Sequence, residues 1–244
     1  HLGAMSFLNA IEVGEETLLS RVKILSTISG GTLTGVMYAA KLADEGTFKD
    51  CFDKLYDLLE KDELVEHALH KLNNPGRWKN KYKSRDVINA FAEVYNEQFY
   101  DEATFAKLYD NPVSHLDDII FGASEFSSGI QFRFQEEEDH GLFGNGNYHL
   151  PVEVAKEIRL ADAAASSSCF PGGFEPMVMP IDYGNGPKSA VNKAWAEADY
   201  VTTGIMDDGI LDNQGIEGVK QAEARNATEI AGPFVGTYIV SDVT

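Results

Sequence analysis

The segment from Arg21 to Ala43 constrains the fold more than any other part of the sequence. Residues 21–28 are short, apolar and rich in β-branched side chains, which is typical of a buried strand. Gly30 and Gly31 then require a tight turn, and apolar residues return at helical spacing from Leu33 to Ala43. A buried strand that leads through a turn into a helix is the basic unit of α/β proteins.

Strands and helices are expected to alternate along the rest of the chain as well. Further strands are expected at residues 119–126, 130–134 and 234–240, and helices at residues 2–11, 152–165 and 216–224. This order predicts an α/β fold with a mainly parallel central sheet. From residue 47 to about residue 109 the spacing is helical throughout. We therefore predict that residues 45–115 form a helical insert or cap, whose apolar face packs as core or, alternatively, contacts a substrate as a lid.

Composition excludes several classes of protein. The 244 residues include 20 basic and 39 acidic side chains, so the formal net charge is −19. Nucleic-acid binding needs clustered cations, and this balance argues against it. No run of 18 apolar residues occurs, so no helix is expected to span a membrane. The chain is expected to be soluble, and its compartment is unknown, with the cytoplasm and the periphery of a membrane as the two alternatives. Two cysteines cannot form a disulfide framework, which leaves the compartment open.

Ser29 is the strongest candidate for chemistry. Gly30 and Gly31 leave room for a sharp turn that holds the Ser29 hydroxyl at the carboxyl end of the sheet. The N-terminus of the following helix favours negative charge that develops there. Nucleophilic serines in such turns usually occur as Gly-x-Ser-x-Gly, and here Thr27 replaces the first glycine. An ordinary strand-to-helix turn is the alternative interpretation.

A nucleophilic serine needs a base, and the chain offers two kinds. His149 is the last histidine, so a triad in the order serine, acid, histidine would have to use it. The other candidate is a carboxylate. Asp207 and Asp208 follow an apolar pair and precede Gly209, so at least one of them lies on a tight turn at a strand end. A plain Asp-Gly β-turn would explain the same residues without chemistry.

Three segments, taken in this order, resemble the patatin-like phospholipase family. They are Ser29-Gly30-Gly31, the small-residue and Phe-Pro segment from Ser166 to Pro176, and Asp208-Gly209 with Asn213 shortly after. The resemblance implies a single patatin-like hydrolase domain over residues 1–244, with a three-layer architecture and with both ends truncated.

The resemblance also implies a chemistry. Ser29 would be the nucleophile and Asp208 its general base, in a dyad without histidine and without a metal or other cofactor. Gly30 and Gly31 would form the elbow and supply an oxyanion donor, and Gly209 would form the turn after the acid. The implied reaction is hydrolysis of lipid acyl esters, of phospholipase A or lysophospholipase type, through an acyl-enzyme.

The chain departs from the family pattern at three points. Thr27 and Ile210 stand where the family prefers small residues. The glycine-rich oxyanion loop of the family is expected upstream of His1. These departures keep a second hypothesis open, namely a non-catalytic patatin-like domain that binds lipid or a protein partner.

A basic and aromatic stretch runs from Arg77 to Arg85, with Trp78 and Tyr82 between its cations. Such a stretch suits lipid headgroups and predicts a peripheral membrane contact, although a cationic loop neutralised by the acidic body is the simpler alternative. His67 and His70 lie at helical spacing and are expected to be solvated rather than to bind a metal.

Overall fold

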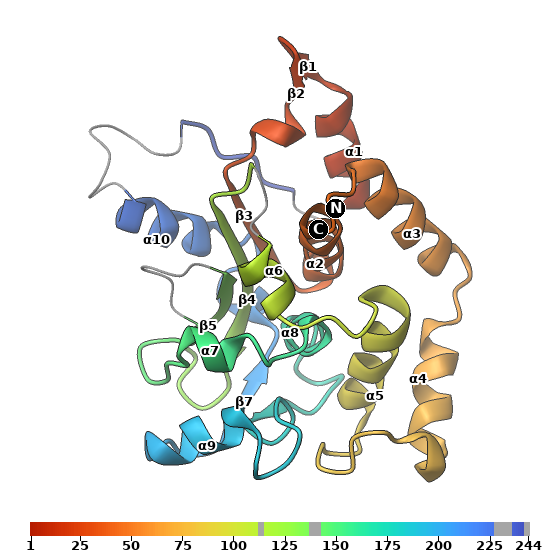
Figure 1. Cartoon of the computed structure of the whole chain (residues 1–244), viewed down its shortest axis with the longest axis vertical. Coiled ribbons are helices and arrows are strands. Elements are labelled where there is room, and N and C mark those ends of the chain that lie inside the picture. The colour runs from red at the N-terminus through yellow and green to blue at the C-terminus, as the bar shows by residue number, and fades with distance from the viewer. Residues whose placement is uncertain (112–114, 137–142, 227–235, 242–244) are drawn as a thin grey trace.

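The computed structural model describes residues 1–111, 115–136, 143–226 and 236–241 (Figure 1). Its main sheet has five strands, in the order β3-β4-β7-β6, with β5 also paired to β4. The strands are β3 (Ile24–Ile28), β4 (Asp118–Glu125), β5 (Gln131–Glu136), β6 (Met177–Met179) and β7 (Thr203–Met206).

The pairing corrects the expected mainly parallel sheet. Among the described strands only β3 and β4 pair in parallel, whereas β4–β5, β4–β7 and β6–β7 pair antiparallel. The reason is local for β4 and β5, because residues 126–130 join them as a hairpin with Gly129 at φ 66°. The sheet is therefore mixed, with all of β4 buried at its centre.

Helices cover both faces of this sheet (Figure 1). On one face lie α2 (Gly30–Ala43) and α8 (Leu160–Ser167). On the other lies α10 (Ile216–Asn226), where a Cβ on Gly218 would lie 3.4 Å from Ile120 of β4. Side chains alternate along a strand, so Gly122 and Ser124 of β4 face α10 as Ile120 does.

The region expected to be helical is helical. It contains α3 (Phe48–Glu60), α4 (Leu64–Asn73), α5 (Val87–Val94), a π-helical turn (Tyr95–Phe99) and α6 (Ala106–Asp110). The α3 helix begins at a capping box, in which Thr47 and Asp50 satisfy each other's backbone N–H groups. The α5 helix packs against α8, so this region reaches the core. Its description as an insert or cap over residues 45–115 stays a prediction.

Several smaller elements complete the chain. They are α1 (Leu2–Ala10), β1 (Glu12–Val13), β2 (Glu16–Thr17), η1 (Leu19–Arg21), η2 (Pro75–Arg77), α7 (Val152–Ala155), α9 (Ala190–Glu197) and η4 (Asp208–Ile210). The single helix expected at 152–165 is split into α7 and α8, because Arg159 is extended, with ψ 140°. The strand expected at 234–240 is absent from residues 236–241, and its first two residues lie outside the described part.

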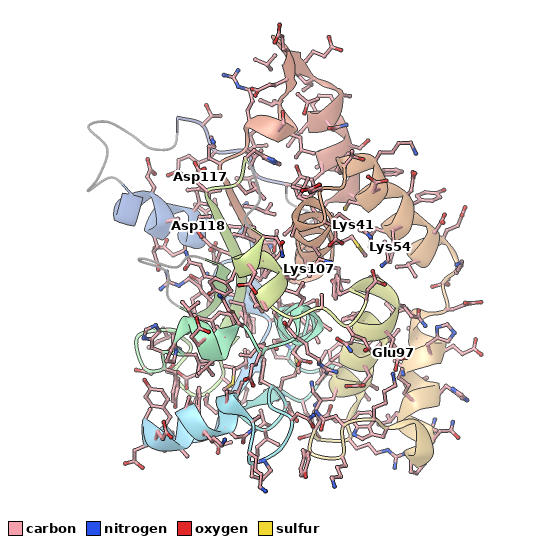
Figure 2. All side chains as sticks on the ribbon, viewed as in Figure 1. Lys41, Lys54, Glu97, Lys107, Asp117 and Asp118 are labelled. Carbon is pink, nitrogen blue, oxygen red and sulfur yellow. The ribbon has the colours of Figure 1, made fainter. Side chains whose placement is uncertain are left out.

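Ion pairs connect surface elements of the helical region, and Figure 2 labels two of their cations, Lys54 and Lys107. Lys54 contacts Asp101 at 2.7 Å, and Lys107 contacts Asp44 at 2.7 Å. Because both aspartates are about half exposed or more, each pair contributes only about 0–1 kcal/mol to stability.

Candidate active site

Ser29 lies where β3 ends and α2 begins, in a backbone conformation that is rare for a residue with a side chain. Its φ is 53° and its ψ is −135°. Such conformations cost about 1–3 kcal/mol and persist only where the surroundings hold them. Ser29 as a whole is partly exposed.

The hydroxyl of Ser29 donates a hydrogen bond to Asp207. The distance from Ser29 Oγ to Asp207 Oδ2 is 2.7 Å. Asp207 is only 3% exposed, and its other carboxylate oxygen accepts the N–H of Gly209 at 2.7 Å. The Asp207 N–H in turn donates to the carbonyl of Cys169 at 3.0 Å. The carboxylate is therefore held in place on both sides.

Asp208 makes a different set of contacts. Ser124 Oγ donates to its Oδ1 at 2.5 Å, and Gln131 Nε2 donates to its Oδ2 at 2.7 Å. The hydrogen bond expected between Ser29 and Asp208 is thus made by Asp207 instead.

The local backbone explains this difference. Asp207, with φ −55° and ψ 131°, links the end of β7 to the short helix η4, which begins at Asp208, so the two side chains point to different partners. Asp208 turns toward the face that α10 covers, where its carboxylate lies 3.4 Å from the position that a Cβ on Gly122 would take. Asp207 is consequently the residue that reaches Ser29.

Burial changes the acidity of Asp208. Loss of solvent raises its pKa to about 7, although the hydrogen bonds from Ser124 and Gln131 favour the charged form and act against that rise. Asp208 is fully buried and Gln131 Oε1 has no hydrogen-bond partner in the described structure. A protonated Asp208 could donate to that oxygen after a flip of the Gln131 amide.

The glycines expected at the site occupy distinct places. Gly30 is exposed, and a Cβ there would have nothing within 4 Å, so its surroundings are open to a ligand. Gly31 packs against His1, whose ring would lie 3.2 Å from a Cβ on that residue. Gly209 forms the turn after the aspartates and donates to Asp207.

Thr27 and Ile210, the two residues that depart from the family pattern, both fit their surroundings. Thr27 packs against α2 at Gly35, where the absence of a side chain leaves room for it: a Cβ on Gly35 would lie 2.6 Å from Thr27 Cγ2. Ile210 is 61% exposed and points away from the core. Neither substitution therefore distorts the turn that carries Ser29 or the turn that carries Asp207.

Two serines contact the backbone of Ser29 and have no role that the sequence alone assigns. Ser167 Oγ accepts the N–H of Ser29 at 2.9 Å, and Ser168 Oγ donates to the Ser29 carbonyl at 3.2 Å. They lie at the carboxyl end of α8. The run of three serines at 166–168 is the one signal in the sequence that could have drawn attention to them.

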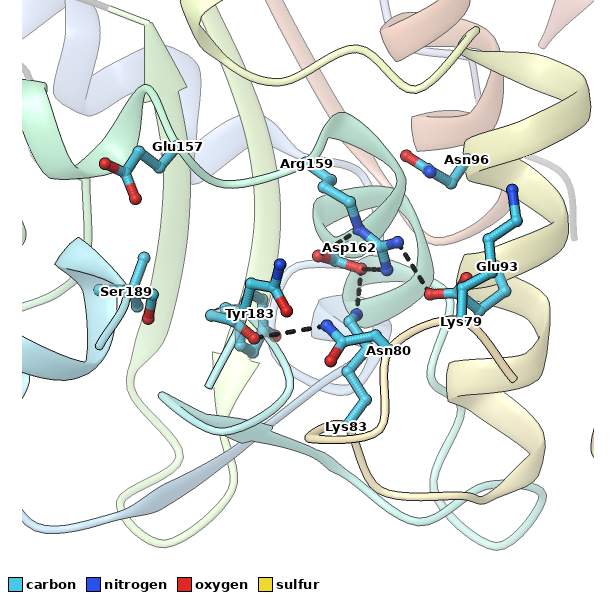
Figure 3. Close-up of a pocket in the computed structure, with 13 residues that line it drawn as sticks. Lys79, Asn80, Lys83, Glu93, Asn96, Glu157, Arg159, Asp162, Tyr183 and Ser189 are labelled. Atoms are coloured by element: carbon cyan, nitrogen blue, oxygen red, sulfur yellow. Dashed lines mark hydrogen bonds and ion pairs between the residues drawn. The ribbon is translucent and has the colours of Figure 1, made fainter. Parts of the chain in front are cut away.

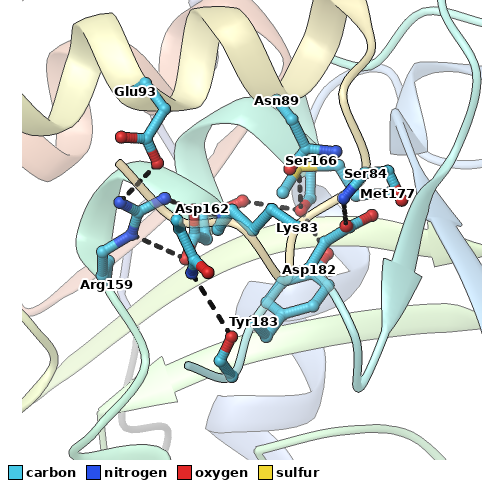
Figure 4. A network of polar contacts seen from close by, with 12 residues as sticks. Lys83, Ser84, Asn89, Glu93, Arg159, Asp162, Ser166, Met177, Asp182 and Tyr183 are labelled. Atoms are coloured by element: carbon cyan, nitrogen blue, oxygen red, sulfur yellow. Dashed lines mark hydrogen bonds and ion pairs between the residues drawn. The ribbon is translucent and has the colours of Figure 1, made fainter. Parts of the chain in front are cut away.

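A buried cluster of four charged residues lies at the other end of α8 (Figure 4). Asp162 contacts Lys83 at 2.5 Å and Arg159 at 2.7 Å, and Arg159 contacts Glu93 at 2.8 Å. Burial raises the pKa of Asp162, but the charges of Arg159 and Lys83 outweigh it and hold that pKa below its usual value. A cavity of about 250 Å³ opens beside the cluster (Figure 3). Neither Ser29 nor Asp207 lines it.

Other residues singled out in the sequence lie away from Ser29. His149 is exposed, and its backbone N–H donates to the Tyr200 hydroxyl, whereas the Ser29 hydroxyl donates to Asp207 and has no hydrogen bond to His149 in the described structure. His67 Nδ1 contacts Gln98 at 2.9 Å. Within the described ranges, no three His, Cys, Asp or Glu side chains gather so as to hold a metal ion.

The basic stretch from Arg77 to Arg85 is engaged largely within the protein. Lys79 pairs with Glu97 and Glu102, and Lys83 belongs to the buried cluster. Arg85 donates to a backbone carbonyl at the end of α4. Lys81 lies over the ring of Tyr82 at 5.0 Å, and both are exposed.

Comparison with known protein families gives one match, which covers most of the chain. The family model of patatin-like phospholipases matches residues 1–218. The chain belongs to the patatin-like phospholipase family. Members of this family are typically lipid acyl hydrolases. Neither the curated proteins nor the solved structures compared with the chain match it. No helix in the described segments is long and apolar enough to span a bilayer.

Proposed function

We propose that this patatin-like protein hydrolyses lipid acyl esters, with Ser29 as nucleophile and Asp207 as general base. The observation that carries the proposal is the 2.7 Å hydrogen bond from the Ser29 hydroxyl, on its sharp turn, to the buried Asp207 carboxylate. A nucleophile within hydrogen-bond reach of a base that is itself oriented by other groups is the arrangement that covalent catalysis requires. The proposal includes a three-layer core, supported by helices on both faces of the sheet.

The reaction follows from these positions. Ser29 Oγ attacks the ester carbonyl carbon while Asp207 takes its proton, and the oxyanion forms beside the N-terminus of α2, where the Gly30 N–H can donate to it. Collapse of this intermediate breaks the ester bond, and Asp207 returns the proton to the leaving alkoxide. Water then attacks the acyl-enzyme while Asp207 accepts its proton, and Asp207 gives that proton to Ser29 Oγ as the bond to the acyl group breaks and the fatty acid leaves. A phospholipase A or lysophospholipase corresponds to this sequence of steps.

Exposed apolar side chains beside the site support a lipid substrate. Phe170 is 61% exposed, Ile210 is 61% exposed and Leu211 is 52% exposed. They follow Ser168 and Asp207 closely in the chain, so an acyl chain near Ser29 would find apolar surface there. A peripheral contact through the Arg77 to Arg85 stretch would depend on Lys81 and Tyr82, because its other described cations have partners inside the protein.

Labelling with a fluorophosphonate, followed by mass spectrometry, tests the proposal on the full-length protein. We expect a single adduct on Ser29. Asp207→Asn should lower the labelling rate by about 100-fold or more, as loss of a general base does. Asp208→Asn is the matched control, since it makes the same change one residue away, and its labelling rate should stay within about threefold of wild type.

The other outcomes are equally informative. If only Asp208→Asn removes the label, Asp208 is the base and the observed pairing of Ser29 is not the catalytic one. If His149→Ala removes it, the triad hypothesis is correct. If folded wild-type protein takes no label, the turn is structural and the protein is a non-catalytic patatin-like domain that binds lipid or a partner.

A further inference from the structure

Two consecutive serines of α8 hold the backbone of Ser29 from both sides. We propose that Ser167 and Ser168 are positioning residues that keep the nucleophile in its unusual conformation, an inference that rests on the role of Ser29 proposed above. The Ser29 N–H is bound by Ser167 and its carbonyl by Ser168.

The hydrogen bonds of Ser167 have only one consistent direction. A hydroxyl has one proton, and Ser167 gives it to the carbonyl of Gly122 at 2.6 Å. It therefore accepts from the Ser29 N–H, and also from the Thr32 hydroxyl at 2.8 Å. Thr32 in turn accepts from Thr27 at 3.2 Å. The fully buried Ser167 hydroxyl thus uses its donor and both acceptor positions, which leaves it no freedom to rotate.

These partners belong to different elements. Gly122 lies on β4, Thr32 lies in the first turn of α2, and Ser29 joins β3 to α2. Ser167 therefore connects the sheet, the helix behind the nucleophile and the nucleophile itself through one oxygen. Ser168 makes a weaker contact, because its single proton is shared between the carbonyls of Ser29 at 3.2 Å and Ala164 at 2.8 Å.

The position of α8 is fixed at its other end by the buried charged cluster. Asp162, five residues before Ser167, binds both Lys83 and Arg159 (Figure 4). Five residues of helix rise about 7.5 Å, so the cluster lies close behind the serines. Because ion pairs fix one end of α8, the Ser167 and Ser168 hydroxyls at its other end can take a defined position relative to the turn that carries Ser29. The cluster therefore supports the same positioning role from a distance.

Alanine variants of neighbouring serines test this role with a matched control. Ser166 is fully buried on the same helix, and its hydroxyl contacts Tyr183 and the carbonyl of Asp162 but not Ser29. For Ser167→Ala we expect kcat and the fluorophosphonate labelling rate to fall by about 10- to 100-fold, with KM within about twofold. Ser168→Ala should lose less, about two- to fivefold, and Ser166→Ala should stay within about twofold. A uniform loss in all three variants, or none in Ser167→Ala, overturns the proposal.

Hydrogen exchange provides a readout that does not depend on activity. We expect amide exchange in residues 29–32 to become at least about tenfold faster in Ser167→Ala and to stay unchanged in Ser166→Ala, because only the first loses the acceptor of the Ser29 N–H. Unchanged protection in Ser167→Ala would overturn the positioning role even if the protein is no enzyme. Absence of wild-type labelling together with faster exchange would instead reject only the catalytic role of Ser29.

Discussion

Asp207 and Asp208 are neighbours in the chain and have opposite surroundings. Asp207 faces Ser29, while Asp208 is enclosed by Ser124 and Gln131 on the side that α10 covers. The enclosed carboxyl is the one with the raised pKa, about 7, because burial disfavours its charged form. At the residue scale, the aspartate that contacts Ser29 and the aspartate enclosed beside α10 are therefore two different residues.

This environment of Asp208 predicts a pH-dependent stability. In the unfolded chain the pKa of the group is near its usual value of 3.8, but in the folded protein the group stays protonated up to about pH 7. The folded state thus binds more protons in this window, and the free energy of unfolding falls as the pH rises through it. Asp208→Asn removes the effect. Its free energy of unfolding relative to wild type should rise by roughly 2–3 kcal/mol between about pH 5 and pH 7.

Urea unfolding of both proteins at several pH values measures this difference. A difference that stays constant across the window would show that Asp208 is already charged in the folded protein at low pH.

At the scale of elements, α8 joins the helical region to the turn that carries Ser29. Its first turn carries Asp162, which pairs with Lys83 from the segment between α4 and α5, and its last residues contact Ser29. The charged side chains of this cluster are almost fully buried apart from Arg159. Buried ion pairs add little net stability when intact, but removal of one partner leaves an uncompensated charge.

The cluster therefore predicts a large effect of Lys83→Met. The free energy of unfolding should fall by about 3 kcal/mol, at the lower end of the range for a broken buried pair, because Arg159 still compensates Asp162. Lys54→Met is the control, since it breaks a pair with the exposed Asp101 and should cost at most about 1 kcal/mol. Chemical denaturation of both variants measures the two costs. Equal small losses would mean that water reaches Lys83.

At the scale of the whole molecule, charge opposes contact with anionic surfaces. The net charge is −19, and within the Arg77 to Arg85 stretch Lys79 and Lys83 are paired with carboxylates of the protein. The exposed apolar residues near the site carry no charge to attract headgroups. Contact with lipid should therefore depend on apolar contacts and be hindered by long-range repulsion wherever the lipid is anionic.

Salt dependence of hydrolysis on vesicles tests this view. Raising the ionic strength from about 0.01 M to about 0.15 M shortens the Debye length from about 30 Å to about 8 Å. We expect activity on anionic vesicles to rise severalfold over this range and activity on zwitterionic vesicles to change little. A fall in activity on anionic vesicles, abolished by Lys81→Ala, would instead assign the membrane contact to the basic stretch.

The sequence by itself determined the local features of this protein. Short segments of the sequence predict the strand and helix around Ser29, the helical region from α3 to α6 and the family membership. They can do so because hydrophobic spacing and turn residues act over a few positions. The candidate nucleophile could be named for the same reason.

Only the tertiary structure decided how distant segments meet. The choice between Asp207 and Asp208 depends on how the chain turns from β7 into η4, because this turn directs the two side chains to different partners. Three other features also depend on residues that are far apart in the chain. They are the antiparallel pairing of β7, the contact of Ser167 with Ser29 and the burial of Lys83 against Asp162. No local pattern encodes such contacts, because their free energy comes from packing and hydrogen bonds that exist only once the whole core has formed.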